Sequence, residues 1–295
     1  MKVLVFYSGG KDSQAALILS IERYGLNNCT AVFCDTGWEN PITYNHITET
    51  CKDLSVKLEI IKSKKYNGMI DLAFKRKRFP STKARFCTQE LKIIPAIDFI
   101  LNQNDNLLII EGIRRNESNA RSKMNAECTY FKYYFEPYDF DKKGKPKFYT
   151  YRKKDIIKWC EKYNADKLRP IFNWSAIDTI NFIKKKKQDV NPLYYMGFSR
   201  VGCFPCIMNN HSGLKLIIEN HPEQWNAVKA AEIGLNSSFF KPDYIPFRFR
   251  TGITSAGKRY STAEDIERYI KGKNNTIDLF DTETPGCLSV YNLCE

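Results

Sequence analysis

A short apolar run followed directly by a glycine pair opens the chain and limits how the rest can fold. Residues 3–7 are aliphatic and aromatic, which is typical of a strand covered on both faces. Gly9 and Gly10 have no Cβ, so the backbone there can turn sharply and come close to a ligand. Good helix formers follow over residues 14–19. The stretch predicts a strand, a tight turn and a helix, and the free amides at that helix start suit an anion.

The residues of this turn indicate which class of anion it could bind. They read Ser-Gly-Gly-Lys-Asp-Ser, which lacks the glycine spacing of a Walker phosphate loop. A glycine pair alone also allows a tight connection without any ligand. The whole string, however, resembles the signature of the PP-loop ATP pyrophosphatases, which hold the pyrophosphate of ATP while they adenylylate a substrate. The resemblance implies an ATP site built from Ser8, Gly9, Gly10, Lys11, Asp12 and Ser13.

Apolar strands and amphipathic helices alternate through the first half of the chain. Strands are expected over residues 30–34, 57–61 and 107–110, and helices over residues 41–51 and 89–101. This alternation is typical of an α/β fold with a doubly wound parallel sheet, in which ligands bind at the carboxyl ends of the strands. The polar residues directly after the second strand are therefore expected at the nucleotide: Asp35, Thr36 and Gly37.

The loop after residues 107–110 is rich in arginine. It begins with Gly112 and contains Arg114, Arg115 and Arg121. Guanidinium groups are forked donors that match phosphate or sulfate, although an arginine loop can also be merely solvated. We expect Gly112 at the nucleotide, and we expect Arg114 and Arg121 to offset negative charge on the reacting group.

The periodicity changes in the second half of the chain. Residues 124–151 alternate aromatic and polar residues, which predicts a β-hairpin that covers a core or stacks on nucleic-acid bases. Amphipathic helices are expected over residues 151–163 and 174–187. We therefore divide the chain into a nucleotide-binding α/β domain over residues 1–200 and a small cysteine-bearing C-terminal region over residues 201–295.

Charge and hydropathy limit which partners and which cellular compartment are expected for the protein. The chain has 295 residues and a formal net charge of +13. Such a charge suits a polyanionic partner, DNA or RNA above all, although lysines on solvated helix ends produce the same balance. No apolar run approaches the roughly 20 residues that a membrane helix needs, and no signal-peptide pattern precedes the first strand. We expect a cytoplasmic protein without a membrane partner.

The ten cysteines of the chain are not expected to form a disulfide framework in the cytoplasm. Cys203 and Cys206 form a Cys-x-x-Cys pair, which can bind zinc, ligate an iron–sulfur cluster or act as a redox dithiol. Further thiols stand at Cys87 and, near the end of the sequence, at Cys287 and Cys294. Four thiolates gathered from such distant stretches would complete a [4Fe–4S] or a tetrahedral zinc site.

As a whole, residues 2–206 resemble the PAPS reductase-like family, the sulfonucleotide-reductase branch of the adenine nucleotide alpha-hydrolase (HUP-type) fold. The resemblance implies an adenine nucleotide as the ligand. In that family, the cysteine-bearing reductases of adenosine phosphosulfate bind a [4Fe–4S] cluster through a Cys-Cys pair and a later Cys-x-x-Cys. Five ordered pieces carry the resemblance: Ser8 to Ser13; Asp35-Thr36-Gly37 with Pro41; Arg85-x-Cys87 with Leu91-Lys92 and Pro95; Gly112-x-Arg114 with Glu117-Ser118 and Arg121; and Asn191-Pro192-Leu193-Tyr194 leading to Gly202-Cys203-x-x-Cys206.

Three departures from the family pattern alter the expected chemistry. The chain has a phenylalanine where the reductases have the first cysteine of the pair. The ligand set implied here is therefore Cys87, Cys203, Cys206 and Cys287, with Cys294 as the alternative fourth ligand and zinc as the alternative metal. The first turn is also unmodified, like that of ATP-using members such as the small subunit of ATP sulfurylase and the ATPase component of DNA phosphorothioation systems. Finally, the tail cysteines do not reproduce the Glu-Cys-Gly-Leu-His-like end of the reductases.

These features together predict an ATP pyrophosphatase that adenylylates an acceptor for sulfur transfer in nucleic-acid modification. Mg²⁺ is expected at the phosphates, and a sulfur-donor or electron-donor protein is the expected partner. Two alternatives stay open: a reductase that releases sulfite from a sulfonucleotide with Cys287 or Cys294 as nucleophile, and a nucleic-acid-binding regulatory protein for which ATP is only a ligand. The residues expected to act in catalysis are Asp12, Ser13, Arg114 and Arg121.

Overall fold

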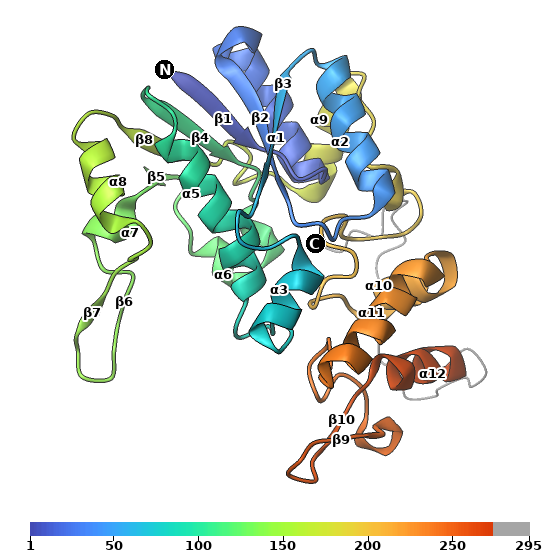
Figure 1. Ribbon diagram of the computed structural model, residues 1–295. Coiled ribbons are helices and arrows are strands. Elements are labelled where there is room, and N and C mark those ends of the chain that lie inside the picture. Colours follow the sequence, from blue (N-terminus) through green and yellow to red (C-terminus); the bar gives the residue numbers. More distant parts are fainter. Residues whose placement is uncertain (274–295) are drawn as a thin grey trace.

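A six-stranded sheet forms the centre of the structure, a computed structural model that describes residues 1–273 (Figure 1). The strands are β1 (Lys2–Phe6), β2 (Cys29–Asp35), β3 (Lys57–Lys62), β4 (Leu107–Glu111), β5 (Glu127–Thr129) and β8 (Ala165–Leu168). Their order is β3-β2-β1-β4-β8-β5, and all neighbours are parallel except β5, which runs antiparallel to β8. The chain moves outward from β1 in both directions, as in other doubly wound sheets.

Helices cover both faces of the sheet. The longer ones are α1 (Lys11–Tyr24), α2 (Pro41–Asp53), α3 (Met69–Arg76), α5 (Ile94–Leu101), α8 (Lys153–Cys160) and α9 (Ala176–Lys185). Short helical turns are η1 (Leu26–Asn28), α4 (Phe86–Thr88), η2 (Gln89–Ile93), η3 (Arg115–Glu117), α6 (Asn119–Ser122), α7 (Lys132–Phe135) and η4 (Pro192–Tyr194). Val3 and Val5 of β1 pack in a cluster with side chains of α1 and α2, whereas Leu4 packs on the opposite face with side chains of α5 and α8. The predicted α/β class with a doubly wound sheet is confirmed.

Residues 124–151 differ from the long hairpin expected there. The beginning of this stretch forms β5 at the edge of the main sheet instead. Phe131 and Tyr134 lie at the helical turn of α7, where both are buried and pack edge to face, and Phe131 also contacts Trp159. Their spacing of three residues is helical, so the aromatic alternation was a misleading indication of a strand. The hairpin that does form is short and pairs β6 (Asp139–Phe140) with β7 (Pro146–Lys147).

The C-terminal part of the described chain is a helical unit with one small hairpin. It contains α10 (His211–Asn220), α11 (Pro222–Leu235), η5 (Phe247–Phe249), α12 (Ala263–Lys273) and the antiparallel strands β9 (Gly252–Ile253) and β10 (Arg259–Tyr260). Its side chains Trp225 and Ile266 belong to the same buried cluster as Ala15 of α1, Leu72 of α3 and Ile183 of α9. Both sides of the expected boundary at residue 200 thus contribute to one core. Among residues 1–273, no helix is long and apolar enough to cross a membrane.

A buried histidine makes the stability of this core depend on pH. His46 of α2 lies within 3.3 Å of the Gln14 Oε1 atom, and burial lowers its pKa to about 4. In the unfolded chain the pKa of histidine is about 6.5, so the unfolded state takes up a proton first as the pH falls. We expect the free energy of unfolding to drop by about 2 kcal/mol from this group between about pH 7 and pH 5. Urea unfolding at both pH values measures the drop. His46→Gln cannot take up that proton, and an identical pH dependence in this variant would contradict the assignment.

Candidate functional site

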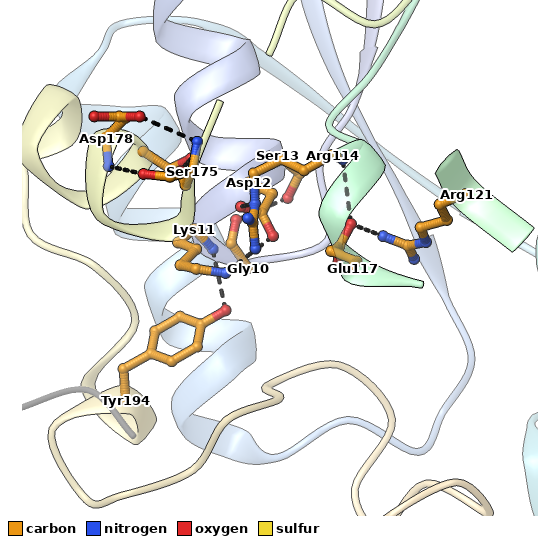
Figure 2. Close-up of polar contacts among 11 residues, drawn as sticks. Gly10, Lys11, Asp12, Ser13, Arg114, Glu117, Arg121, Ser175, Asp178 and Tyr194 are labelled. Carbon is orange, nitrogen blue, oxygen red and sulfur yellow. Dashed lines mark hydrogen bonds and ion pairs between the residues drawn. The ribbon is translucent and has the colours of Figure 1, made fainter. Parts of the chain in front are cut away.

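A cleft of about 370 Å³ lies at the carboxyl edge of the sheet, where the sequence predicted a ligand site. The segment that contains Cys203 and Cys206 forms the opposite wall. Figure 2 shows the first turn of α1 facing Tyr194 and the loop that contains Arg121. The residues of the predicted nucleotide site that line the cleft are Ser8, Gly10, Lys11, Asp12, Ser13, Thr36 and Gly112. The structure therefore brings together most of the residues assigned from the sequence.

The turn between β1 and α1 is held by its own serine and by Tyr194. The Ser13 hydroxyl donates to the Gly10 carbonyl oxygen at 2.9 Å and accepts from the Ser8 amide at 3.2 Å. The Lys11 amide donates to the Tyr194 hydroxyl at 3.3 Å (Figure 2). The amides that follow in the first turn have no acceptor within the helix, which is the arrangement that binds anions. Tyr194 was part of the family resemblance but was not assigned to the site.

Buried hydrogen bonds connect this turn to the opposite wall of the cleft. Gly9 adopts a positive φ of 76°. Its carbonyl oxygen accepts from the Asn191 amide group at 3.2 Å, and the same amide group donates to the Thr43 hydroxyl at 3.1 Å. The Thr43 hydroxyl in turn donates to the Val201 carbonyl oxygen at 2.9 Å. The turn and the segment around Val201 are thus fixed relative to each other.

Gly112 allows the end of β4 to touch the first turn of α1. A Cβ at this position would stand 2.4 Å from the Ser13 Cα and 2.5 Å from the Ser13 amide nitrogen. Real Cβ atoms do not approach backbone atoms this closely, so the packing requires glycine. The strand end and the helix start are therefore in direct backbone contact at the cleft.

Asp12 is held by two cations. Its carboxylate lies 3.0 Å from the Lys11 ammonium group and 2.8 Å from the Arg114 Nε atom (Figure 2). Arg114 is buried, and it lies behind Asp12 rather than among the residues that line the cleft. Burial lowers the pKa of Lys11, and Asp12 offsets part of that change. In this geometry Arg114 orients a carboxylate, whereas the sequence suggested that it would face the reacting group.

Arginines from distant parts of the chain crowd the mouth of the cleft. Arg121, Arg85 and Arg200 all line it, together with the ammonium groups of Lys11 and Lys92. Burial lowers the pKa of Arg121, and the neighbouring charge of Arg200 lowers it further. The Glu117 carboxylate, which also lines the cleft, pairs with Arg121 and offsets part of this charge (Figure 2), and the remaining excess of cations favours an entering anion. Sequence reasoning assigned Arg121 but not Arg85 or Arg200, because nothing local shows that residues so far apart share one cleft.

The polar loop after β2 contributes less to the cleft than expected. Asp35 accepts from the Gly37 amide at 2.8 Å and from the Tyr44 hydroxyl at 2.6 Å, and it pairs with Lys62 at 2.7 Å. Gly37 adopts a positive φ of 62° in this turn. Only Thr36 of the three assigned residues lines the cleft. Asp35 and Gly37 therefore shape the turn that presents Thr36, and their assignment to the nucleotide stays a prediction.

Three cysteines assigned as ligands line the same cleft. Cys87, Cys203 and Cys206 all line it. Burial raises the pKa of the Cys203 thiol, and the nearby thiols of Cys206 and Cys87 raise it further, while Lys92 opposes the change. The fourth assigned ligand, Cys287, and its alternative, Cys294, lie outside the described residues. Within residues 1–273, no three histidine, cysteine or carboxylate side chains are placed closely enough to hold a metal ion.

A second, mostly apolar pocket of about 280 Å³ adjoins the cleft. It opens between the carboxyl ends of β1, β2 and β4, and its walls include Phe6, Val32, Ala96 and Tyr130. Ser8, Ser13, Lys92 and Gly112 line both cavities, so the two spaces meet at the first turn of α1. A ligand with a flat apolar part and an anionic part can therefore occupy both.

Comparisons with known proteins identify a family match and several relatives of this chain. Residues 2–209 match the model of the phosphoadenosine phosphosulfate reductase domain family. A 37.8 kDa protein of Escherichia phage 186, described as uncharacterized, is 29% identical over 83% of this chain and 80% of its own length. An uncharacterized protein of Methanocaldococcus jannaschii is 28% identical over 76% of this chain, which spans only 40% of that protein.

Matches to characterised reductases are shorter or more distant. An adenosine 5'-phosphosulfate reductase of Mycolicibacterium smegmatis is 30% identical over 28% of this chain and 34% of its own length. Among solved structures, phosphoadenylyl-sulfate reductase of Candida auris covers 70% of this chain and 83% of its own, with 15% identity and a TM-score of 0.46.

Proposed function

Because the chain belongs to the phosphoadenosine phosphosulfate reductase domain family, we propose that it is an ATP pyrophosphatase that adenylylates an acceptor for sulfur transfer. The observation that supports this proposal is the group of five cations, two lysines and three arginines, that line the cleft together with the first turn of α1. A triphosphate is the anion that needs so many donors. The apolar pocket beside the same turn has room for the adenosine.

The reaction uses the cleft chiefly for positioning and charge. A nucleophilic oxygen of the acceptor attacks the α-phosphorus of ATP, and the bond from that phosphorus to the bridging oxygen breaks. The bonding electron pair leaves with pyrophosphate, and the adenylyl group stays on the acceptor. Lys11, Arg121 and Arg200 neutralise the negative charge that grows on the leaving pyrophosphate. The first-turn amides hold the phosphates in line for the attack.

Asp12 is the carboxylate that we assign to Mg²⁺. It lines the cleft, and its ion pairs with Lys11 and Arg114 fix its orientation. Mg²⁺ binds through one or two carboxylates and phosphate oxygens, so a single oriented carboxylate beside a phosphate site fits it. The ion would supply further neutralisation of the phosphate charge.

The thiols of the opposite wall would hold a [4Fe–4S] cluster, with zinc as the alternative. Cys87, Cys203 and Cys206 line the cleft but do not stand close enough to hold an ion as described, so they would have to draw together around it; Cys287, outside the described residues, is the assigned fourth ligand. Sulfur donors suit both iron–sulfur clusters and zinc. Such a cluster would supply sulfur or redox chemistry next to the adenylylated acceptor. The net charge of +13 favours nucleic acid as that acceptor.

A second candidate function is reduction of a sulfonucleotide with release of sulfite. It is favoured by the short match to adenosine 5'-phosphosulfate reductase and by the same cation group, which suits sulfate as well as phosphate. Sulfite release from adenosine phosphosulfate with a thiol reductant, but no pyrophosphate release from ATP, would favour this candidate instead.

Arginine substitutions test the proposed reaction. We expect the purified protein to bind ATP with Mg²⁺ and to release pyrophosphate, and Arg121→Met to lower the rate by about 100-fold because one charge-stabilising donor is lost. Arg115→Met is the matched control, since Arg115 is exposed, lies outside the cleft and contacts the Asn173 Oδ1 atom at 3.5 Å. Its rate should stay within about threefold of wild type. Equal losses in both variants, or no nucleotide binding by calorimetry, would refute the proposal.

A further inference from the structure

A second surface, in the C-terminal helical unit, combines exposed aromatic rings with arginines. Residues 246–260, here called the arginine–aromatic hairpin, contain η5 and the β9–β10 pair. Phe247 is 62% exposed and Ile253 is 64% exposed. Large apolar side chains that gather in solvent indicate a binding partner more often than isolated ones do.

All charged side chains of the arginine–aromatic hairpin are positive. It contains four cationic side chains and no acidic one: Arg248, Arg250, Lys258 and Arg259. The Arg248 guanidinium lies 4.9 Å from the centre of the Phe249 ring. Those of Arg250 and Arg259 lie 5.8 Å and 5.4 Å from the centre of the Phe247 ring. Cations and rings therefore form a joint surface, in which each ring is flanked by positive charge.

The base of the hairpin is firmly attached to the C-terminal helices. The amide and the hydroxyl of Thr251 both donate to the buried carboxylate of Asp265, at 2.8 Å and 2.7 Å. The Arg250 Nε atom donates to the Ile245 carbonyl oxygen at 2.8 Å. A partner would therefore meet a surface whose rings and cations are already positioned, which lowers the entropy cost of binding.

A groove of about 800 Å³ continues from the hairpin toward the nucleotide cleft. Residues 79–83 contribute to the lining, and Lys83, Lys241 and Asp243 line the groove beside several hydroxyl side chains, with Lys241 3.7 Å from the Asp243 carboxylate. Ile207 lines both this groove and the nucleotide cleft. The groove and the nucleotide cleft are therefore neighbours, on either side of the buried Ile207 side chain.

We propose that the arginine–aromatic hairpin and this groove bind single-stranded nucleic acid and lead it to the cleft. The cations meet the phosphates, and the exposed rings offer faces on which unpaired bases stack. A duplex keeps its base faces covered, so exposed phenylalanine rings favour a single strand. Binding of the single strand does not depend on the proposed function; only the reaction that follows binding rests on it.

The β6–β7 hairpin offers a matched comparison. It also projects from the body of the protein, in a different place (Figure 1), and exposes Phe140 beside Lys142 and Lys143. Unlike the arginine–aromatic hairpin it contains acidic residues, and Asp139 pairs with Lys147 at 2.8 Å. The positive electrostatic potential around the β6–β7 hairpin is therefore weaker. Removing two of its lysines changes the net charge of the protein by the same amount as removing two arginines of the arginine–aromatic hairpin.

Fluorescence anisotropy of the full chain with a labelled single-stranded oligonucleotide of about 20 nucleotides tests the proposal. Arg248→Ala/Arg259→Ala is expected to weaken binding at least about tenfold and to reduce the salt slope by about 1.4, because two phosphate contacts are lost. Phe247→Ala should weaken binding about tenfold without changing the slope, since stacking releases no counterions. Lys142→Ala/Lys143→Ala should stay within about twofold of wild type.

Several results would overturn the proposal. They are equal losses in the two double variants, a preference for duplex of the same sequence, tighter binding to anionic vesicles than to the oligonucleotide, or no oligonucleotide binding at about 50 mM salt. ATP binding, measured by calorimetry without oligonucleotide, should be unchanged in all three variants. Oligonucleotide binding by a protein that does not bind ATP would support this surface and count against the proposed function alone.

Discussion

Gly112→Ala is expected to weaken ATP binding by at least about 100-fold and to stop pyrophosphate release. The added Cβ would overlap the Cα and the amide nitrogen of Ser13. A backbone cannot rotate out of the way as a flexible side chain can, so the first turn of α1 has to move by about an ångström, which is enough to misalign the phosphates. Calorimetry measures the affinity for ATP, and circular dichroism shows whether the variant is folded.

Gly202→Ala is the control for this substitution. Gly202 lines the same cleft, but a Cβ there would meet no atom within 4 Å. Its affinity for ATP should therefore be close to that of wild type. If a folded Gly112→Ala variant bound ATP as tightly as the Gly202→Ala variant, the phosphates would have to bind elsewhere.

Cys203→Ser is expected to reduce the metal content of protein purified without oxygen at least about tenfold. The wild type should contain about four irons per chain and show the thiolate-to-iron absorbance of a [4Fe–4S] cluster. Cys203 is expected to matter because it is one of the three assigned ligands that line the cleft, with Cys87 and Cys206. Metal analysis and the absorbance spectrum report on the site without any measurement of activity.

Cys160→Ser provides the comparison. Cys160 lies on α8 with a free thiol and packs against the cluster that contains Leu4 and side chains of α5. Iron should be retained in that variant. Unchanged iron in the Cys203→Ser variant would show that the thiols of the cleft bind no cluster. A colourless wild type with one zinc per chain would keep the thiol site and replace the cluster by zinc.

The parts of the fold that local patterns specify could be predicted from the sequence. β1, β2 and β4 are apolar runs with a clear beginning and end, β3 contains the apolar pair Ile60-Ile61, and the turn at Gly9 and Gly10 lies where its glycines indicated. Strand β8 was missed because it is short and half charged, and only its pairing with β4 makes it a strand. The helical turn of α7 was missed because aromatic residues suit both structures, and packing on Trp159 decides between them.

The composition of the cleft was predicted only in part. Ser8 to Ser13 and Gly112 could be assigned because they belong to short motifs next to strand ends. The role of Arg114 could not, since its ion pair with Asp12 joins residues 102 positions apart. Arg85 and Arg200 were missed for the same reason, because charges meet in three dimensions without leaving a local pattern in the sequence.

The buried cluster shared by α1, α3, α9 and the C-terminal helices determines how a ligand can enter. Swinging those helices outward as a rigid lid would expose Trp225, Ile266 and their apolar neighbours to water. The segment over residues 199–208, most of which lines the cleft, is part of the same fixed structure, because Val201 accepts from the Thr43 hydroxyl and Phe204 is buried. The size of an admissible substrate is then limited by the dimensions of the cleft as it stands, and a long polymer has to present its end or a bulge to it.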